Sequence, residues 1–139
     1  MALTHLLDTS AILVHFLGEP GAELVSDLLS RGSESVALPA PTWVELERRL
    51  AELIPDADEA HRVWKLYTQM LCSFLPINAA AAEAAIALRK SSPGRLPMVD
   101  ALIAGCAKAH HLTLLHRDAH MAAIPQTALA SMALPTDLT

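Results

Sequence analysis

Short runs of apolar residues alternate with longer segments of helical periodicity along this chain. Strands are predicted at 3–7, 35–38, 73–75 and 112–115, with a further strand at 127–134, and helices at 10–17, 20–31, 42–54, 56–71, 78–90, 97–110 and 118–123. This alternation predicts an α/β fold, with a central parallel sheet of four to five strands between two layers of helices. The 139 residues contain no repeat and no linker, so we expect a single domain over 1–139.

The first strand run ends in an acid. Asp8 follows Leu7, and the hydroxyl residues Thr9 and Ser10 then lead into a helical pattern. Ligands bind at the carboxyl ends of parallel strands, where loops and helix N-termini converge. Asp8 is also a good helix N-cap residue, so this position alone leaves capping and ligand binding open.

Three further acids occupy comparable junctions. Glu45 lies in the first turn of the third expected helix, Asp100 lies in the first turn of the sixth, and Asp118 follows the fourth strand. Each has a structural explanation, because Thr42 and Glu45 form a capping box by sequence, Asp100 suits a helix dipole and Asp118 suits an N-cap. Capping explains each position separately, but it does not explain why acids recur at the one edge of the sheet where strand ends meet.

Composition narrows the classes of function. The net charge of −5 argues against a protein that grips nucleic acid through a general basic surface, and the aromatic content of 4% argues against base stacking as the main binding mode. Any action on nucleic acid is therefore expected to be local and metal-assisted. The hydrophobic fraction of 53% exceeds what a small core readily hides, which indicates a partner interface.

The same composition bears on location. No apolar run approaches the roughly 20 residues that a membrane span needs, and no basic leader precedes the first strand. Cys72 and Cys106 lie in apolar helical contexts and are interpreted as buried free thiols. We therefore expect a cytoplasmic protein without a membrane segment.

Four motifs, taken in order, resemble the PIN domain family. They are Leu7-Asp8-Thr9-Ser10-Ala11, Val44-Glu45-Leu46, Leu96-Pro97-Met98-Val99-Asp100-Ala101-Leu102-Ile103-Ala104 and Leu114-Leu115-His116-Arg117-Asp118. Within that family the chain most resembles the VapC-type toxins of bacterial toxin–antitoxin pairs. The resemblance extends from Leu3 to about Ala133.

The resemblance implies a site and an activity. Asp8, Glu45, Asp100 and Asp118 would form an acidic cluster that binds Mg²⁺ or Mn²⁺, with Ser10 supplying a nearby hydroxyl. The chain would then be an endoribonuclease that hydrolyses RNA with metal-activated water, paired with a VapB-like antitoxin and forming a homodimer. The chemistry agrees, because hard cations prefer carboxylate oxygens and crowded carboxylates repel one another until a cation binds. This repulsion predicts a raised pKa for at least one of the acids.

The fourth motif departs from the family pattern. His116 stands where many relatives have Thr, and Met121 stands where many have an aromatic residue. His116 is therefore expected either to contact substrate phosphate or to replace a side chain that held the loop. Arg117 is a candidate phosphate contact, as are Arg95 and Lys108, although a solvated surface role fits all three equally well.

Other side chains are assigned structural roles. Glu47 lies about 200° around its helix from Glu45, so it cannot share the acidic face. None of the seven histidines forms a zinc-binding pattern, and surface or structural roles are predicted for most of them.

Two other functions remain open. The chain is alternatively a housekeeping RNA-processing nuclease of the same fold, or a non-catalytic module whose acids are caps and whose apolar surface binds a partner helix. For the toxin, the groove for an antitoxin helix and the dimer surface are expected over the early helices and the fourth helix, with apolar side chains at Ile12, Leu13, Phe16, Leu24, Leu28, Trp64 and Tyr67.

Overall fold

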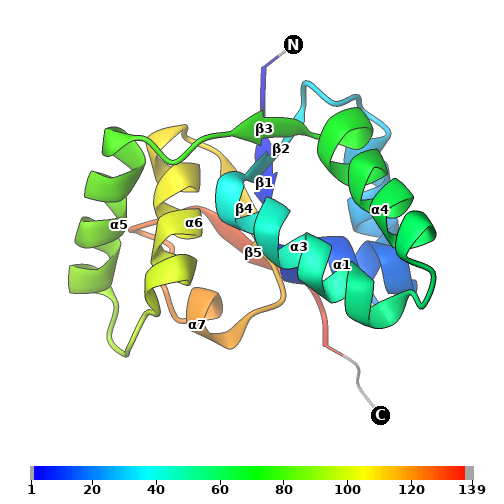
Figure 1. Ribbon diagram of the computed structural model, residues 1–139. Coiled ribbons are helices and arrows are strands. Elements are labelled where there is room, and N and C mark those ends of the chain that lie inside the picture. Colours follow the sequence, from blue (N-terminus) through cyan, green and yellow to red (C-terminus); the bar gives the residue numbers. More distant parts are fainter. Residues whose placement is uncertain (1, 137–139) are drawn as a thin grey trace.

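A computed structural model describes residues 2–136 and shows a five-stranded, wholly parallel sheet. The strands are β1 (His5–Leu7), β2 (Val36–Pro39), β3 (Ser73–Leu75), β4 (Thr113–His116) and β5 (Ser131–Ala133), in the order β3-β2-β1-β4-β5 (Figure 1). The predicted parallel α/β sheet is confirmed.

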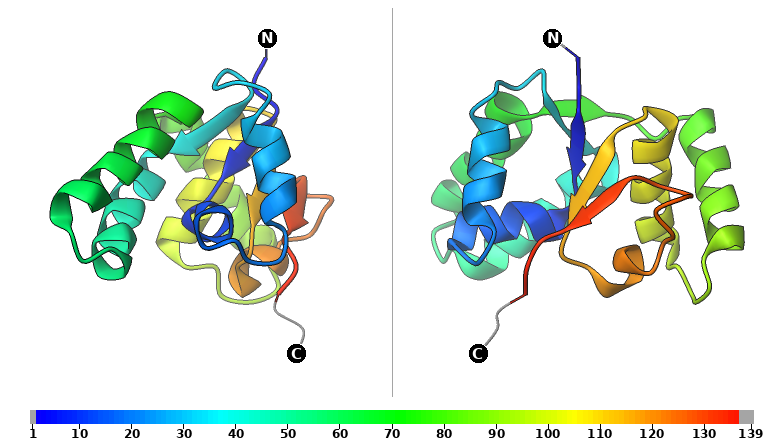
Figure 2. Two further views of the ribbon diagram at one scale, coloured as in Figure 1. Left: turned by 90° about the vertical axis from the view of Figure 1, so that its right-hand side faces the viewer. Right: turned by 180° about the vertical axis from the view of Figure 1, so that it is seen from behind.

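Helices cover both faces of this sheet. On one face lie α1 (Thr9–Leu17), α2 (Ala22–Leu29), α3 (Ala40–Leu53) and α4 (Ala57–Lys65), and on the other lie α5 (Ala79–Ser91), α6 (Met98–Ala109) and the short α7 (Ala119–Ala122) (Figures 1 and 2). Side chains alternate between the faces along each strand, so Leu7 and Leu115 enter the first core while Leu6 and Leu114 enter the second. The three-layer prediction is confirmed.

The order of the strands places a crevice at the carboxyl end of β1. The chain passes from β1 to β2 on one side, whereas β4 pairs with β1 on the other side. In parallel α/β sheets ligands bind at such a reversal of strand order, where loops diverge to opposite faces. The backbone N–H of Asp8 donates to the carbonyl of Leu115 (3.3 Å), so the segments that follow β1 and β4 start side by side.

The helices α5 and α6 pack closely because small residues face each other. A Cβ added at Gly105 would lie 2.4 Å from the carbonyl oxygen of Ala81 and 2.7 Å from the backbone nitrogen of Ala85. The alanine-rich sequence of α5 therefore serves close packing as well as helix propensity. This contact fixes α6, which carries Asp100, against the rest of the layer.

Two predicted helix boundaries are wrong. The helix expected from Thr42 begins at Ala40, because Pro41 fits the first turn of a helix, where no N–H partner is needed. Thr42 is thus buried inside α3 rather than capping it, and Glu45 falls in the second turn. The helix expected through Leu71 changes after Lys65 into a π-helical segment, η1 (Leu66–Leu71).

Two other elements are shorter than expected. The helix expected at 20–31 spans only Ala22–Leu29, and the strand expected at 127–134 is confined to Ser131–Ala133. Before that strand the backbone turns, with the N–H groups of Ala128 and Leu129 both donating to the carbonyl of Pro125.

The surface expected over the early helices is mostly core. Ile12, Leu13 and Leu28 are buried, and Leu24 is exposed. No helix among residues 2–136 is long and apolar enough to cross a membrane. Cys72 and Cys106 are buried free thiols, as predicted, and burial raises their pKa values to about 12 and about 11.

Candidate active site

The four predicted acids line one cavity at the carboxyl edge of the sheet. Asp8, Glu45, Asp100 and Asp118 all border this space, whose volume is about 350 Å³. They come from four elements: Asp8 is the N-cap of α1, Asp118 is the N-cap of α7, Asp100 lies in the first turn of α6 and Glu45 lies in α3. Asp8 and Asp118 thus each cap a helix and also belong to the acidic cluster.

Asp8 is the most buried of these acids, with 5% of its surface exposed. Its Oδ1 accepts hydrogen bonds from the hydroxyl of Ser10 (2.7 Å) and the backbone N–H of Ala11 (3.0 Å). No donor among the described residues reaches its other oxygen, Oδ2, while the side chain borders the cavity. Oδ2 is not among the fully buried unpaired atoms of the described residues, so a cation or water in the cavity is able to reach it.

The electrostatics of Asp8 follow from this position. The pKa of Asp8 is raised to about 7, mainly by burial. The hydrogen bonds from Ser10 and Ala11 oppose this rise, and the charges of Asp118 and Asp100 add to it. The raised pKa of an acid in the cluster is confirmed, but desolvation rather than repulsion is its main cause.

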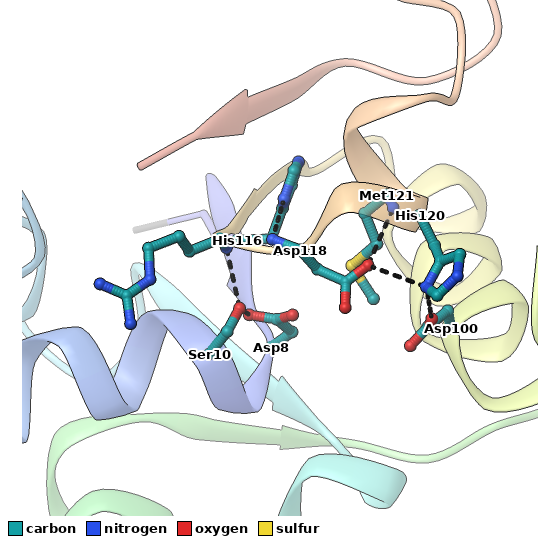
Figure 3. A network of polar contacts seen from close by, with 8 residues as sticks. Asp8, Ser10, Asp100, His116, Asp118, His120 and Met121 are labelled. Carbon is teal, nitrogen blue, oxygen red and sulfur yellow. Dashed lines mark hydrogen bonds and ion pairs between the residues drawn. The ribbon is translucent and has the colours of Figure 1, made fainter. Parts of the chain in front are cut away.

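Ser10 connects the two sides of the crevice. Its hydroxyl donates to Asp8 and accepts a hydrogen bond from the backbone N–H of Arg117 (2.8 Å) (Figure 3). The guanidinium of Arg117 borders the cavity and pairs with Glu19 (2.8 Å), which offsets part of its charge. Ser10 therefore holds the N-terminus of α1 against the loop after β4.

Asp100 and Asp118 face each other across the junction of α6 and α7. The Oδ1 of Asp118 accepts from the backbone N–H of Met121 (3.1 Å), which fixes the carboxylate at the start of α7. Burial raises the pKa of Asp100, and the nearby charges of Asp118 and Glu45 raise it further, while His120 opposes them. The carboxylates of this region are thus close enough to repel one another.

His120 is a member of the site that sequence reasoning missed. Its Nδ1 lies 3.6 Å from Oδ2 of Asp100 and 3.7 Å from Oδ1 of Asp118 (Figure 3). The prediction of a surface or structural role rested on the absence of a zinc motif. The only local signal is the spacing of two residues from Asp118, and the approach of α7 to Asp100 depends on tertiary packing.

The structure separates Glu45 from Glu47 as predicted. Glu45 is exposed and borders the acidic cavity, whereas Glu47 borders a different hollow with Ala51 and Ala57. The capping box assigned to Thr42 and Glu45 is wrong, since α3 has already begun and the hydroxyl of Thr42 has no hydrogen-bond partner among residues 2–136.

His116 holds the loop and does not reach the cavity. It is fully buried, and its Nδ1 accepts from the backbone N–H of Asp118 (3.1 Å). This position favours the role of a side chain that holds the loop over a direct contact with substrate phosphate. Burial lowers the pKa of His116, which agrees with a neutral ring whose Nδ1 is an acceptor.

Basic residues contribute less to the cavity than expected. Arg117 borders it, but the ammonium of Lys108 donates to the carbonyl of Ala128 beside a separate hollow, and Arg95 is exposed in the loop before α6. Arg49, which the sequence did not single out, borders the cavity one turn after Glu45.

The donor set fits a divalent cation. Ligand atoms of Asp100, Asp118 and His120 all lie within 4.8 Å of one another, and the free oxygen of Asp8 belongs to a residue lining the same space. Carboxylate oxygens are the ligands that Mg²⁺ and Mn²⁺ prefer, and a cation would offset the excess negative charge.

Comparison with known proteins places this architecture in context. A family model described as "PIN domain" matches residues 5–126. FitAcB from Neisseria gonorrhoeae is 27% identical, with a TM-score of 0.70 and coverage of 92% of this chain and 96% of that one. VapBC-1 from nontypeable Haemophilus influenzae is 22% identical, with a TM-score of 0.71 and coverage of 94% and 98%. VapBC2 from Rickettsia felis is 14% identical, with a TM-score of 0.74 and coverage of 96% and 100%. No curated protein sequence matches the chain.

Proposed function

The chain belongs to the PIN domain family, as its four motifs predicted, and we propose that it is a metal-dependent endoribonuclease and the toxin of a toxin–antitoxin pair. One observation carries the proposal: Asp8, Asp100 and Asp118, which are distant in sequence, border a single cavity. Helix capping alone does not require these carboxylates to share a space.

In the proposed reaction Asp8, Asp100 and Asp118 hold Mg²⁺ or Mn²⁺, with Glu45 at the rim of the cavity. When bound, such a cation polarises the scissile phosphate and lowers the pKa of a coordinated water. The chain itself positions the carboxylates. Ser10 and the N–H of Ala11 fix Asp8, and the N–H of Met121 fixes Asp118.

Cationic side chains at the cavity offer contacts for a phosphodiester backbone. Arg49 and Arg117 line the same cavity as the acids, and their guanidinium groups pair with Glu52 and Glu19 respectively. These pairs are partly exposed, so a phosphate group is able to exchange with the glutamate. RNA in single-stranded or loop regions suits such a cavity, because its backbone is free to bend toward the acids.

An antitoxin partner and a homodimer belong to the same proposal. The solved structures that resemble this chain include toxin–antitoxin complexes, one of them described as "Toxin-antitoxin complex from Klebsiella pneumoniae". Large apolar side chains remain exposed on the described surface, among them Leu17, which lines the acidic cavity, and Leu24 in α2. An amphipathic helix laid in a groove would cover such residues.

Cleavage of single-stranded RNA by the purified chain tests the activity. We expect cleavage with Mg²⁺ or Mn²⁺, none with EDTA, and loss of cleavage in Asp8→Asn and Asp100→Asn. Glu47→Gln is the matched control, because this residue lies on the same helix as Glu45 but borders another hollow. A chain that binds no cation and cleaves no RNA would instead be the non-catalytic module.

The biological role is tested separately by expression. We expect the chain expressed alone to arrest growth, and Asp100→Asn to abolish the arrest. Co-expression with the product of a neighbouring small gene should restore growth. An active nuclease that leaves growth unchanged would be a housekeeping RNA-processing enzyme instead.

A further inference from the structure

His120 stands between two of the proposed ligands. It lies in the short α7, and its Nδ1 points toward the carboxylates of both Asp100 and Asp118 (Figure 3). Its side chain is 54% exposed, so the ring is accessible to solvent rather than packed in the core. Nδ1 makes no hydrogen bond to any of the residues described by the structure.

The separations are those of ligands around an ion. The distances of 3.6 and 3.7 Å from Nδ1 to the two carboxylate oxygens exceed the usual hydrogen-bond range. Two donors bound to one cation at about 2.1 to 2.2 Å lie about 3.0 to 3.8 Å apart when the angle at the cation is about 90 to 120°. The two distances from Nδ1 therefore match those between ligands of one cation. The ligand atoms of all three residues lie within 4.8 Å of one another, so a small side-chain movement brings them into the range of a shared ion.

A second observation points to the same place. Asp8 has only 5% of its surface exposed, and its side chain borders the cavity. Its Oδ2 has no hydrogen-bond donor among residues 2–136. The cavity is thus lined by a carboxylate without a donor on one oxygen and by two members of the cluster of Asp100, Asp118 and His120.

We propose that His120 supplies a nitrogen ligand, beside Asp100 and Asp118, to the divalent cation of this site, and that it shifts the preference from Mg²⁺ toward transition-metal ions. The proposal rests on the proposed function, because it assumes that the acidic cavity binds a cation. Imidazole nitrogen binds borderline ions such as Co²⁺ and Zn²⁺ well, whereas Mg²⁺ strongly prefers oxygen. A site with one nitrogen and carboxylate oxygens consequently discriminates between these ions.

Calorimetric titration of the purified chain with Mg²⁺ and with Co²⁺ tests this proposal without any substrate. We expect His120→Asn to weaken Co²⁺ binding by about tenfold or more and Mg²⁺ binding by less than about threefold. The visible spectrum of bound Co²⁺ should change in the variant, because a nitrogen ligand has been lost. His111→Asn is the matched control, since His111 is exposed outside the cavity and has a φ of 56°, which Asn tolerates.

The outcomes separate the two proposals. If His120→Asn weakens the binding of Mg²⁺ and Co²⁺ equally, or changes the binding of neither, His120 is not a ligand. The nuclease proposal still stands in that case, as long as wild type binds Mg²⁺ or Mn²⁺ and cleaves RNA. If wild type binds none of these ions, both proposals are overturned. Asp100→Asn should abolish the Co²⁺ signal, and its persistence there would place the ion on other histidines and contradict the assignment.

Discussion

The hydroxyl of Ser10 accepts a hydrogen bond from the backbone N–H of Arg117 and donates one to Asp8, so a single oxygen joins segments that are 107 residues apart. Ser10 is a positioning residue in this arrangement, because it holds the carboxylate of Asp8 and the loop that carries Asp118. Its two contacts make it the most direct test of how the site is held together.

Ser10→Ala should weaken Mn²⁺ binding several-fold and lower the free energy of unfolding by about 1 to 2 kcal/mol. The reason is the loss of a donor to Asp8 together with an acceptor for the N–H of Arg117. Ser10→Thr retains the hydroxyl and should restore Mn²⁺ binding in calorimetry. Ser30→Ala is a control, since the hydroxyl of Ser30 contacts only an exposed carbonyl. Equal Mn²⁺ affinities in wild type and Ser10→Ala would contradict the positioning role.

Asp8→Asn should melt at a higher temperature than wild type in EDTA above pH 7. The pKa of Asp8 is raised from 3.8 to about 7 in the fold, so the folded state is penalised once the carboxylate must ionise. The penalty is absent below about pH 4, grows as the pH rises toward 7 and is constant above that. Asn keeps the N-cap, so capping is preserved.

Melting temperatures measured from pH 4.5 to 8 check this prediction. The difference between Asp8→Asn and wild type should widen with pH and reach several degrees. Mn²⁺ at ten times its dissociation constant should stabilise wild type by about 1.4 kcal/mol and the variant much less. A difference that does not change with pH would show that Asp8 does not titrate in this range.

His116→Ala should lower the free energy of unfolding by about 2 to 4 kcal/mol. The change leaves a cavity at a fully buried position and removes the acceptor of the Asp118 N–H. Chemical denaturation measures the loss, and Mn²⁺ titration of the folded variant should show weaker binding because Asp118 is less well held. His61→Ala is a comparison at an exposed histidine. Unchanged stability would mean that His116 does not anchor the loop.

Gly105→Ala should destabilise the fold by about 1 to 3 kcal/mol, although alanine favours a helix. The added Cβ would lie 2.4 Å from a backbone oxygen of α5, so α5 and α6 must separate. Gly94→Ala is the matched control, because nothing lies within 4 Å of its added Cβ. The denaturant midpoints of the two variants measure the difference in stability. A Gly105→Ala protein as stable as Gly94→Ala would contradict the close packing of α5 and α6.

The residues predicted from sequence are those fixed by local pattern. Asp8 and Asp118 each end an apolar strand run, and parallel strands bring such ends to one edge, so their convergence followed from periodicity. Glu45 and Glu47 were separated by helix geometry alone. These are the features for which short-range spacing determines position.

The residues that were missed depend on how elements pack against one another. His120 meets Asp100 only because α7 lies against α6, and Arg49 borders the cavity only because of the way α3 crosses it. The role of His116 also required the structure, since its sequence position is compatible with a ring that points either to the cavity or to the core. Pro41 misled the boundary of α3 because proline ends a strand and begins a helix equally well.

The position of β4 between β1 and β5 has a consequence for protein synthesis. Asp8 is made early, whereas Asp118 and the N–H of Arg117 that Ser10 requires are made 110 and 109 residues after Asp8, by the numbering of the chain. At about 5 to 20 residues per second, roughly 5 to 20 s pass on the ribosome between the first and last of these groups. Throughout that interval the nascent chain carries an incomplete cavity, so the acidic site is assembled only after β4 has inserted beside β1.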